Sequence, residues 1–581
     1  MNKKLVYLII IIFLLPFFLS GCANSSRGPS GGPKDTIPPD LLGINPAYYT
    51  TNFKGKQVSF TFNEYVQFKD QNKQFIISPP LEKRPVLKIR GKQAIVEFAS
   101  DLHDNTTYFI DFGTSVVDLN ESNPAKYLST VFSTGSVIDS MIYVGRLVDA
   151  FTLDPVEGSF VFLYEEDIDS IPYLKNPNAL TRSDKDGVFV IKGLKPIDYK
   201  IVAVDDLNGN YKYDGGGERI AFSNTLVQTM RINDSDTLTY GELPMLKMFS
   251  ENLRRQFLSS YKQPEKRQIE LIFNQINPEI ISFDVENLTT NDFIIEHSRW
   301  NDTLRYWIKN QTVPDSIKAV ISYMKTDSLN QLSPTELNLK MELEEKEDAK
   351  TTQSNRNRKK KEQEEDIEEI ITPNIISNAR TILEKNIRLS FKSPLITCDT
   401  TLLALYKFND EGDKKEKINF KWMQDTLHIR EYSIQAEWKT SGKYELNVQP
   451  YAFTDIYGLS NDSIVITFET ANPDKYSSIT VNLNNADGTY IVQLIKDKNV
   501  LSQKIASGEG KLVFRYLDAA KYRIRIIEDK NNNGIWDAGL YLQKLQPERV
   551  GFVKFSDNSD ELDLRASWDI EQMVDINLIF K

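Results

Sequence analysis

Two short loops carry the side chains whose types and spacing could bind a metal ion. In each loop, Asp and Asn place oxygen atoms at alternate positions, and a further Asp follows. Such a loop can curl around a hard cation, because Ca²⁺ takes about six to eight oxygen ligands. The candidate ligands are Asp206, Asn208, Asn210 and Asp214 in the first loop, and Asp529, Asn531, Asn533 and Asp537 in the second. The spacing therefore predicts two candidate calcium sites.

The second loop resembles an EF-hand calcium loop, with Gly534 at the turn position. Both loops depart from that motif where a bidentate Glu is expected, because Gly217 and Leu540 stand there and Glu218 comes one place late. In the first loop, Tyr211 replaces the turn glycine. Two carboxylates per loop predict weak binding, with a Kd of roughly 10⁻⁴ to 10⁻³ M. A metal-free hairpin, in which Asp and Asn side chains bind the loop backbone, explains the same residues, so both alternatives stay open.

Side chains suited to catalysis are sparse. The three histidines, His103, His297 and His428, are scattered along the chain. His103 lies between Asp101 and Asp104, and a surface turn explains this cluster without a general base. No Gly-x-Ser-x-Gly elbow, His-Glu-x-x-His pair or Gly-rich phosphate loop occurs in the sequence. Paired carboxylates stay open, because 81 acidic residues offer many pairs. We therefore expect a protein that is not an enzyme.

The N-terminal segment predicts export and a lipid anchor. Lys3 and Lys4 precede the apolar run Leu5–Leu19, which is too short for a membrane span of about 20 residues and favours a signal peptide. The residues Leu19-Ser20-Gly21-Cys22 that close it resemble the lipobox of bacterial lipoproteins. That resemblance implies cleavage before Cys22 and a diacylglyceryl thioether, with palmitate-type acyl chains, on its sulfur. An ordinary signal sequence that ends in Cys is the alternative.

The residues after Cys22 indicate where in the cell envelope the predicted lipoprotein is located. Ala23–Pro39 is rich in Ser, Gly and Pro and is expected to be a flexible tether. Ala23 follows the cysteine and no acidic run is present. This is similar to Gram-negative lipoproteins of the outer membrane that face the periplasm. Cys398, the other cysteine, then has no partner in the chain and is expected to be a small buried hydrophobic residue.

Composition favours β-structure and excludes one class of partner. The chain has 581 residues, which predicts about four domains. It contains 31 Phe and 26 Tyr and is rich in β-branched residues, a mixture typical of strands. The net charge of −11 argues against a general nucleic-acid binder, which needs a basic surface.

The first folded segment shows alternating apolar residues. Examples are the runs 58–62, 94–98 and 108–112, and several such strands in about 100 residues predict a sandwich. The motifs Asn45-Pro46, Phe62-Asn63-Glu64, Asn105-Thr106-Thr107-Tyr108 and Phe132-Ser133-Thr134-Gly135 resemble the bacterial Ig-like domain of S-layer-type and envelope lipoproteins. Asp118, Asn120 and Asn123 match the polar residues that precede its last strand.

The next segment has a different pattern. The strand at 160–164 and the turn Asp184-Lys185-Asp186-Gly187 look like a prealbumin-like, carboxypeptidase-regulatory-type sandwich. Its spacing from Gly187 to Leu194, Tyr199 and Asp206 recurs from Gly510 to Leu517, Tyr522 and Asp529, which indicates an internal repeat. In the repeat, Tyr522, Ile524 and Ile526 are expected to face inward, with Lys521, Arg523 and Arg525 outward.

The whole chain is thus predicted to be all-β, with tandem Ig-like and prealbumin-like β-sandwich domains after a lipoprotein signal peptide. The charged run 342–372 is expected to be a linker, because its basic and acidic clusters cancel. The predicted boundaries are 1–21 for the signal peptide, 22–36 for the tether, 37–137 for an Ig-like domain, 140–246 for a prealbumin-like domain, 250–341 for a β-domain of open type, 342–372 for the linker, 373–472 for a second Ig-like domain and 474–581 for a second prealbumin-like domain.

Together these features predict a membrane-anchored lipoprotein that acts as a binding or scaffolding component of the bacterial cell envelope. The alternative is an accessory subunit of a system that hydrolyses glycan or peptide. The expected partners are the membrane, through the lipid on Cys22, and an envelope protein or polymer. No cofactor is required by the sequence beyond the two candidate Ca²⁺ loops.

Overall fold

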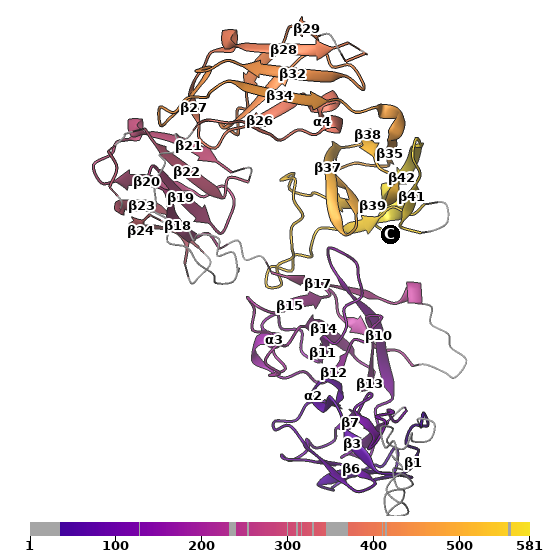
Figure 1. The fold of residues 1–581 in the computed structure, drawn as a ribbon. Helices are drawn as coiled ribbons and strands as arrows, with labels where there is room; N and C mark the ends of the chain where they lie inside the picture. The colour runs from indigo at the N-terminus through magenta and orange to yellow at the C-terminus, as the bar shows by residue number, and fades with distance from the viewer. Residues whose placement is uncertain are drawn as a thin grey trace, which may run out of the picture. The chain divides into compact units, whose positions relative to one another are not determined.

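The computed structural model describes residues 35–126, 128–231, 240–251, 255–298, 300–309, 312–314, 316–327, 331–343, 370–409, 411–412, 415–555 and 559–581. Strands dominate these residues, and the helices are short (Figure 1). The fold is all-β, as predicted. The chain separates into two compact units, one formed by 1–148, 155–214 and 220–248, and the other by 149–154, 215–219 and 249–581.

The first sandwich packs two main sheets around an aromatic core. Its elements are β1 (Leu41–Asn45), β2 (Gln57–Phe62), β3 (Val66–Phe68), α2 (Gln71–Gln74), β4 (Ile76–Ser78), β5 (Val86–Arg90), β6 (Gln93–Glu97), β7 (Thr107–Asp111), β8 (Val116–Asp118) and β9 (Ser129–Ser133). The sheet orders are β1-β2-β6-β5 and β4-β7-β9, with β3 paired to β8. The predicted period of two is confirmed, since Val58, Phe60 and Phe62 are all fully buried.

The second sandwich forms one long, folded strand path. Its elements are β10 (Met141–Asp149), β11 (Phe160–Tyr164), α3 (Ile171–Leu174), β12 (Ala179–Arg182), β13 (Val188–Leu194), β14 (Asp198–Val204), β15 (Arg219–Phe222), β16 (Val227–Gln228), η2 (Tyr240–Glu242) and β17 (Met245–Ser250). The order is β12-β11-β14-β15-β17-β10-β13, and β16 pairs with β14. Strand β17 runs past the boundary predicted at residue 246, because Met248 as well as Leu246 packs into the core of this sandwich.

The third segment, whose type the sequence left open, is also a two-sheet sandwich. Its elements are β18 (Leu258–Glu265), β19 (Gln268–Phe273), β20 (Ile280–Val285), η3 (Thr290–Asp292), β21 (Phe293–His297), β22 (Thr303–Ile308), β23 (Ser316–Thr326) and β24 (Leu332–Glu342). The sheets have the orders β18-β19-β22-β21 and β20-β23-β24. Leu271 from the first sheet and Ile321 from the second share one core, which makes the segment an independent packing unit.

The fourth sandwich repeats the strand plan of the first. Its elements are β25 (Asn374–Ile375), α4 (Ala379–Lys385), β26 (Ile387–Ser390), β27 (Leu395–Cys398), η4 (Thr400–Leu402), β28 (Leu403–Phe408), β29 (Lys415–Ile418), β30 (Lys421–Gln424), β31 (Glu431–Gln435), β32 (Lys443–Val448), β33 (Phe453–Asp455) and β34 (Ile464–Glu469). The orders β25-β26-β31-β30, β27-β33 and β28-β32-β34 match those of the first sandwich, with β29 added beside β28.

Individual side chains repeat along with the strands. Asp118 and Asp455 are buried at the ends of the short strands β8 and β33, and each accepts backbone N–H bonds from the turn that follows. The hydroxyls of Tyr108 and Tyr444 each accept from a backbone N–H five residues earlier, at 2.8 and 2.7 Å. These bonds satisfy buried polar groups at the same places in both sandwiches. The two sandwiches therefore share a construction as well as a topology.

The fifth sandwich repeats the plan of the second. Its elements are η5 (Pro473–Lys475), β35 (Ser477–Asn484), β36 (Thr489–Lys496), β37 (Asn499–Ser507), β38 (Gly510–Leu517), β39 (Ala520–Glu528), β40 (Val550–Phe552), β41 (Leu562–Leu564), β42 (Asp569–Asp575) and α5 (Ile576–Ile579). The pairings β36–β37, β36–β39, β39–β40, β39–β41 and β35–β38 match β11–β12, β11–β14, β14–β15, β14–β16 and β10–β13. The internal repeat read from the spacing of Gly, Leu, Tyr and Asp is confirmed.

One predicted surface residue of this sandwich is buried. Tyr522, Ile524 and Ile526 face the core as expected, but Arg525 is also shielded, and its guanidinium donates to Gln493 Oε1 at 2.9 and 2.6 Å. Burial lowers the pKa of Arg525 to about 10. The expectation of an exposed Arg525 was wrong, because the outer face of this sheet is itself covered.

Within the residues described, no helix is both long and apolar enough to cross a membrane.

Candidate functional site

The second loop draws its four predicted residues into one hydrogen-bonded unit. Asp529 is buried directly after β39, and its carboxylate oxygens accept backbone bonds from Asn533 at 3.1 Å and Gly534 at 2.9 Å. Asp537 Oδ2 accepts from the side-chain amide of Asn533 at 2.8 Å and from that of Asn531. The loop backbone thus curls around its own Asp and Asn side chains. This geometry is expected both for a metal-free hairpin and for a loop that binds a cation.

The first loop has the same pattern of hydrogen bonds but a different residue at its turn. Asp206 accepts backbone bonds from Gly209 at 2.6 Å and Tyr211 at 2.8 Å. Asp214 Oδ2 accepts from the amides of Asn208 at 2.5 Å and Asn210 at 2.9 Å. Tyr211 adopts a φ of 58°, close to the 76° of Gly534, so both loops make the same left-handed turn. A side chain at such a φ is strained, which makes the first loop the costlier version.

A third carboxylate joins the second loop, and sequence reasoning missed it. Glu548 is buried and accepts backbone bonds from Lys530 at 2.8 Å and from Asp537 at 3.0 Å. Burial raises the pKa of Glu548, and the nearby charges of Asp537 and Asp529 raise it further. The loop therefore concentrates negative charge that a bound cation would relieve.

The register of the returning strand explains why Glu548 lies there. Asp529 and Asp206 each stand two residues after the last paired residue of β39 and β14. Glu548 and Glu218 each stand two residues before the matching partner on β40 and β15. Counting positions along a continuous loop cannot find Glu548, because the loop before β40 is longer. The available signal was the Glu-Arg pair that precedes both returning strands.

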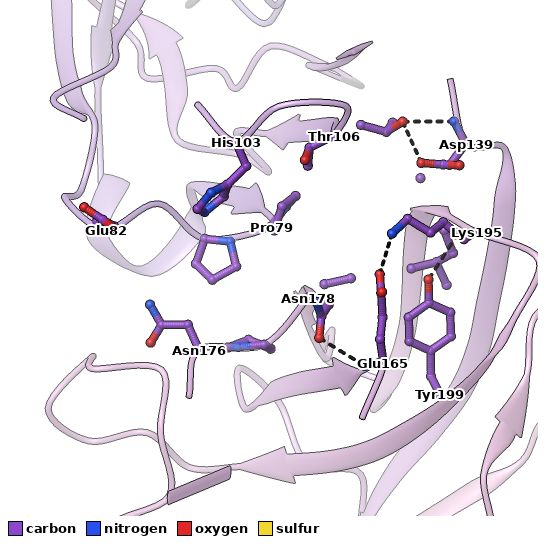
Figure 2. A pocket seen from close by; sticks show the side chains of 16 residues that line it. Pro79, Glu82, His103, Thr106, Asp139, Glu165, Asn176, Asn178, Lys195 and Tyr199 are labelled. Carbon is purple, nitrogen blue, oxygen red and sulfur yellow. Dashed lines mark hydrogen bonds and ion pairs between the residues drawn. The ribbon is translucent and has the colours of Figure 1, made fainter. Parts of the chain in front are cut away.

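A pocket of about 350 Å³ lies between the first and second sandwiches, within the N-terminal unit (Figure 2). Glu82 and His103 come from loops of the first sandwich, and Asn176 and Asn178 face them from the second. Pro79 supplies an apolar wall. Ligand sites often form where two domains meet, because loops of both can line them. His103, expected in a simple surface turn, thus borders a hollow that the sequence did not predict.

Most charged groups of this pocket are already engaged. Lys195 Nζ lies 2.8 Å from Glu165, and Asp139 accepts a hydrogen bond from the hydroxyl of Thr107 at 2.9 Å (Figure 2). Beside the pocket, Ser78 Oγ accepts from the backbone N–H of Leu180 at 3.0 Å. This buried bond ties β4 of one sandwich to β12 of the next, so the walls of the pocket are held together.

A second cluster of metal-ligating types sits between β30 and β31. Ligand atoms of Asp425, His428 and Glu431 all lie within 4.8 Å of one another. The guanidinium of Arg388 pairs with Glu431 and lies 3.7 Å from Asp425. Because a fixed cation already neutralises these carboxylates, the cluster is an ion-pair network. His297, the third histidine, contacts Asn301 at 2.6 Å elsewhere, so the structure does not bring the histidines together.

The two cysteines have different outcomes. Cys22, with the predicted signal peptide, lies outside the described residues, as does most of the charged linker. Cys398 ends β27 and is half-buried. Burial, with a smaller effect of Asp399, raises the pKa of the Cys398 thiol to about 11. A thiol that stays protonated is a poor nucleophile, which fits the expected small hydrophobic residue.

Comparison with known proteins identifies the first sandwich. Residues 35–134 match the family model of the bacterial Ig-like domain. The N-terminal four Ig domains of Dscam1 isoform 8.4 are 9% identical, covering 74% of this chain and 100% of that one, with a TM-score of 0.15. The S-layer protein rSbsC(31-844) is 10% identical, covering 90% of this chain and 68% of that one, with a TM-score of 0.13. Such scores say nothing of a shared overall arrangement. No curated protein sequence matches the chain.

Proposed function

We propose that this chain is a lipid-anchored, non-enzymatic binding or scaffolding component of the bacterial cell envelope. Cys22 carries the lipid, and the folded part extends from an outer-membrane anchor into the periplasm. The lipobox-like residues 19–22 and the bacterial Ig-like domain at residues 35–134 support the proposal. The second and fifth sandwiches are assigned to the prealbumin-like type, on the motifs at 184–187 and 160–164 and on their shared pairing pattern.

The observation that carries the proposal is the duplication of a sandwich pair. Most strand pairings of the first and second sandwiches recur in the fourth and fifth, with β29 added in the fourth. Sandwich domains present loops and edge strands at their surfaces, and such surfaces serve binding and assembly. Function still resides in particular sites on these folds.

Charged contacts between sandwiches of the C-terminal unit favour a scaffold. Arg430 Nε donates to both carboxylate oxygens of Glu296 at 3.0 and 2.9 Å, and its guanidinium lies 5.4 Å from the ring centre of Trp307. Arg380 makes two bonds of 2.8 Å to Asp518. Paired bonds of this kind fix direction as well as distance. Each therefore joins neighbouring sandwiches at a defined contact.

The anchor is tested by fractionation of Cys22→Ser. Wild type is expected in the membrane pellet, and the variant in the soluble fraction, because each buried CH₂ of a lipid chain contributes about 0.8 kcal/mol. Cys398→Ser is the matched control and should stay in the pellet. Unchanged membrane association of Cys22→Ser would contradict the anchor.

The role is tested by affinity purification from detergent-solubilised membranes, followed by mass spectrometry. A stoichiometric envelope partner is the expected result. The purified full-length chain should release no product from peptidoglycan or polysaccharide above a heat-killed control. Turnover by the purified complex, but not by the chain alone, would favour the accessory-subunit alternative over a scaffold.

We also propose that the second loop binds Ca²⁺ as a structural ion. Asp529, Asp537 and Glu548 supply three carboxylates, and Asn531 and Asn533 supply amide oxygens. Support comes from the buried position of Asp529 and the raised pKa of Glu548. An ion bound only by the folded state stabilises it by RT ln(1 + [L]/Kd), which is about 1.4 kcal/mol at tenfold excess.

A further inference from the structure

A second hollow adjoins the pocket of Figure 2 and is lined by aromatic rings. It has a volume of about 260 Å³ and shares Asp139 and Gly193 with the first pocket. Tyr48, Tyr49 and Phe109 of the first sandwich line it. All of these residues belong to the N-terminal unit. The two hollows together are called the junction groove below.

The tyrosines form an exposed aromatic surface. The ring centres of Tyr48 and Tyr49 lie 6.3 Å apart, and Tyr49 is 69% exposed. Tyr49 also has a φ of 60°, a conformation that Gly or Asn adopts more easily. Its backbone N–H bonds to Val131 O at 3.0 Å, which holds it there. The rings of Tyr48 and Tyr49 are therefore accessible to a ligand in the hollow that they line.

The charge of the groove disfavours an acidic ligand. Glu82, Asp139 and Glu165 are set against Lys195 and Lys192. Lys195 pairs with Glu165 at 2.8 Å, and the Lys192 ammonium lies 5.3 Å from the ring centre of Phe109. The three carboxylates outnumber the two ammonium groups, so the groove carries a net negative charge. An anionic ligand would therefore meet uncompensated carboxylates.

The polar half of the groove presents amides instead. The side chains of Asn176 and Asn178 face Glu82 and His103 across the pocket (Figure 2). Amides and carboxylates both form hydrogen bonds with hydroxyl groups. A sugar ring has C–H groups on its face, which stack on aromatic rings, and hydroxyl groups around its edge. A groove with exposed tyrosines at one end and amides with carboxylates at the other matches both features.

We propose that the junction groove binds an uncharged oligosaccharide of hexose or N-acetylhexosamine units. One sugar ring stacks on Tyr48 and Tyr49, and the next places its hydroxyls against Asn176, Asn178 and Glu82. Asp139, which belongs to both hollows, lies where the two sugars join. This inference rests on the proposed envelope role and names the class of polymer that the chain binds.

The test is isothermal titration of the full-length chain in detergent with chitotetraose, cellotetraose and maltotetraose, and with tetragalacturonate as the acidic probe. At least one neutral tetrasaccharide should bind saturably, and tetragalacturonate should not. Tyr49→Ala and Asn176→Ala should each weaken that binding at least tenfold. Both residues are exposed, so neither change should disturb folding.

Tyr451→Ala is the matched control, because Tyr451 is also exposed and has a φ of 64° in another sandwich. It should leave binding unchanged. Absence of saturable binding by all three neutral probes up to 10 mM would overturn the inference, as would equal loss in Tyr451→Ala. Failure of the proposed envelope role can be told apart from failure of this inference. The envelope role is tested by the membrane fractionation of Cys22→Ser, and that substitution does not alter the groove.

Discussion

The loops at 206–214 and 529–537 have the same sequence spacing and the same internal hydrogen bonds, yet their surroundings differ in charge. Arg84 of the first sandwich donates to Gly209 O at 2.9 Å in the first loop. Burial lowers the pKa of Arg182 there, and the charge of Asp206 partly offsets the shift. In the second loop, the buried carboxylate of Glu548 accepts a backbone bond from Asp537 at 3.0 Å. Glu218 holds the matching position before β15 and is also buried, so the loops differ in their arginines and not in the number of nearby carboxylates.

This difference separates two uses of one duplicated element. Arginines beside the first loop supply the positive charge that a cation would bring, and Arg84 ties the loop to the neighbouring sandwich. The second loop brings the carboxylates of Asp529, Asp537 and Glu548 together around its turn. We therefore expect the first loop to act in docking and the second to bind Ca²⁺.

The largest expected effect is the loss of Asp529. Asp529→Ala leaves two loop N–H groups without their buried acceptor, and we expect a loss of roughly 2–3 kcal/mol in the free energy of unfolding without Ca²⁺. Asp206→Ala should cost about 1 kcal/mol, because Asp206 is half-exposed and water can replace it. Urea unfolding of the full chain measures both, with exposed Asp563→Ala as the control. If both substitutions lowered the free energy of unfolding equally, the proposed difference between the two loops would be contradicted.

A smaller effect is expected from Arg84→Ala. Removal of the bond to Gly209 O should cost about 1 kcal/mol and loosen the first loop. Hydrogen exchange should speed up at residues 209–211 and stay unchanged at 533–534. Lys83→Ala, an exposed neighbour, is the control. Faster exchange in both loops would show that Arg84 acts on global stability and not on docking.

The smallest effect concerns pH. Because the folded-state pKa of Glu548 is raised above its ordinary value of 4.5, the folded state binds this proton more tightly than the unfolded state. Its contribution to stability therefore falls as pH rises from about 4.5 through the raised pKa. Glu548→Gln should remove that part of the pH dependence, by less than about 1.4 kcal/mol per pH unit. The measurement is the free energy of unfolding of wild type and Glu548→Gln as a function of pH. If the difference between the two proteins does not change with pH above about 4.5, the raised pKa of Glu548 is contradicted.

Alternating apolar and polar residues predicted the strands well, because a strand with one buried face needs an apolar residue at every second position. Val58, Phe60 and Phe62 show this, and the repeat spacing found the duplicated sandwiches. Arg525 was placed wrongly, because a single strand does not reveal what covers its outer face.

The sites were harder to predict than the strands. The candidate ligands of one loop could be read from local spacing, since they lie within nine residues of one another. Glu548 could not, because strand register brings it back across a longer loop. Likewise, the junction groove depends on contacts such as Ser78 to Leu180, which join residues distant in sequence.

Calorimetric titration of the full chain with Ca²⁺ tests the comparison most directly. We predict one site per chain, with a Kd of roughly 10⁻⁴ to 10⁻³ M. The site should be lost in Asp529→Ala, weakened in Glu548→Gln and unchanged in Asp206→Ala. Two equivalent sites, no binding at 10 mM Ca²⁺, or a site lost with Asp206 but kept without Asp529 would contradict the assignment of calcium to the second loop.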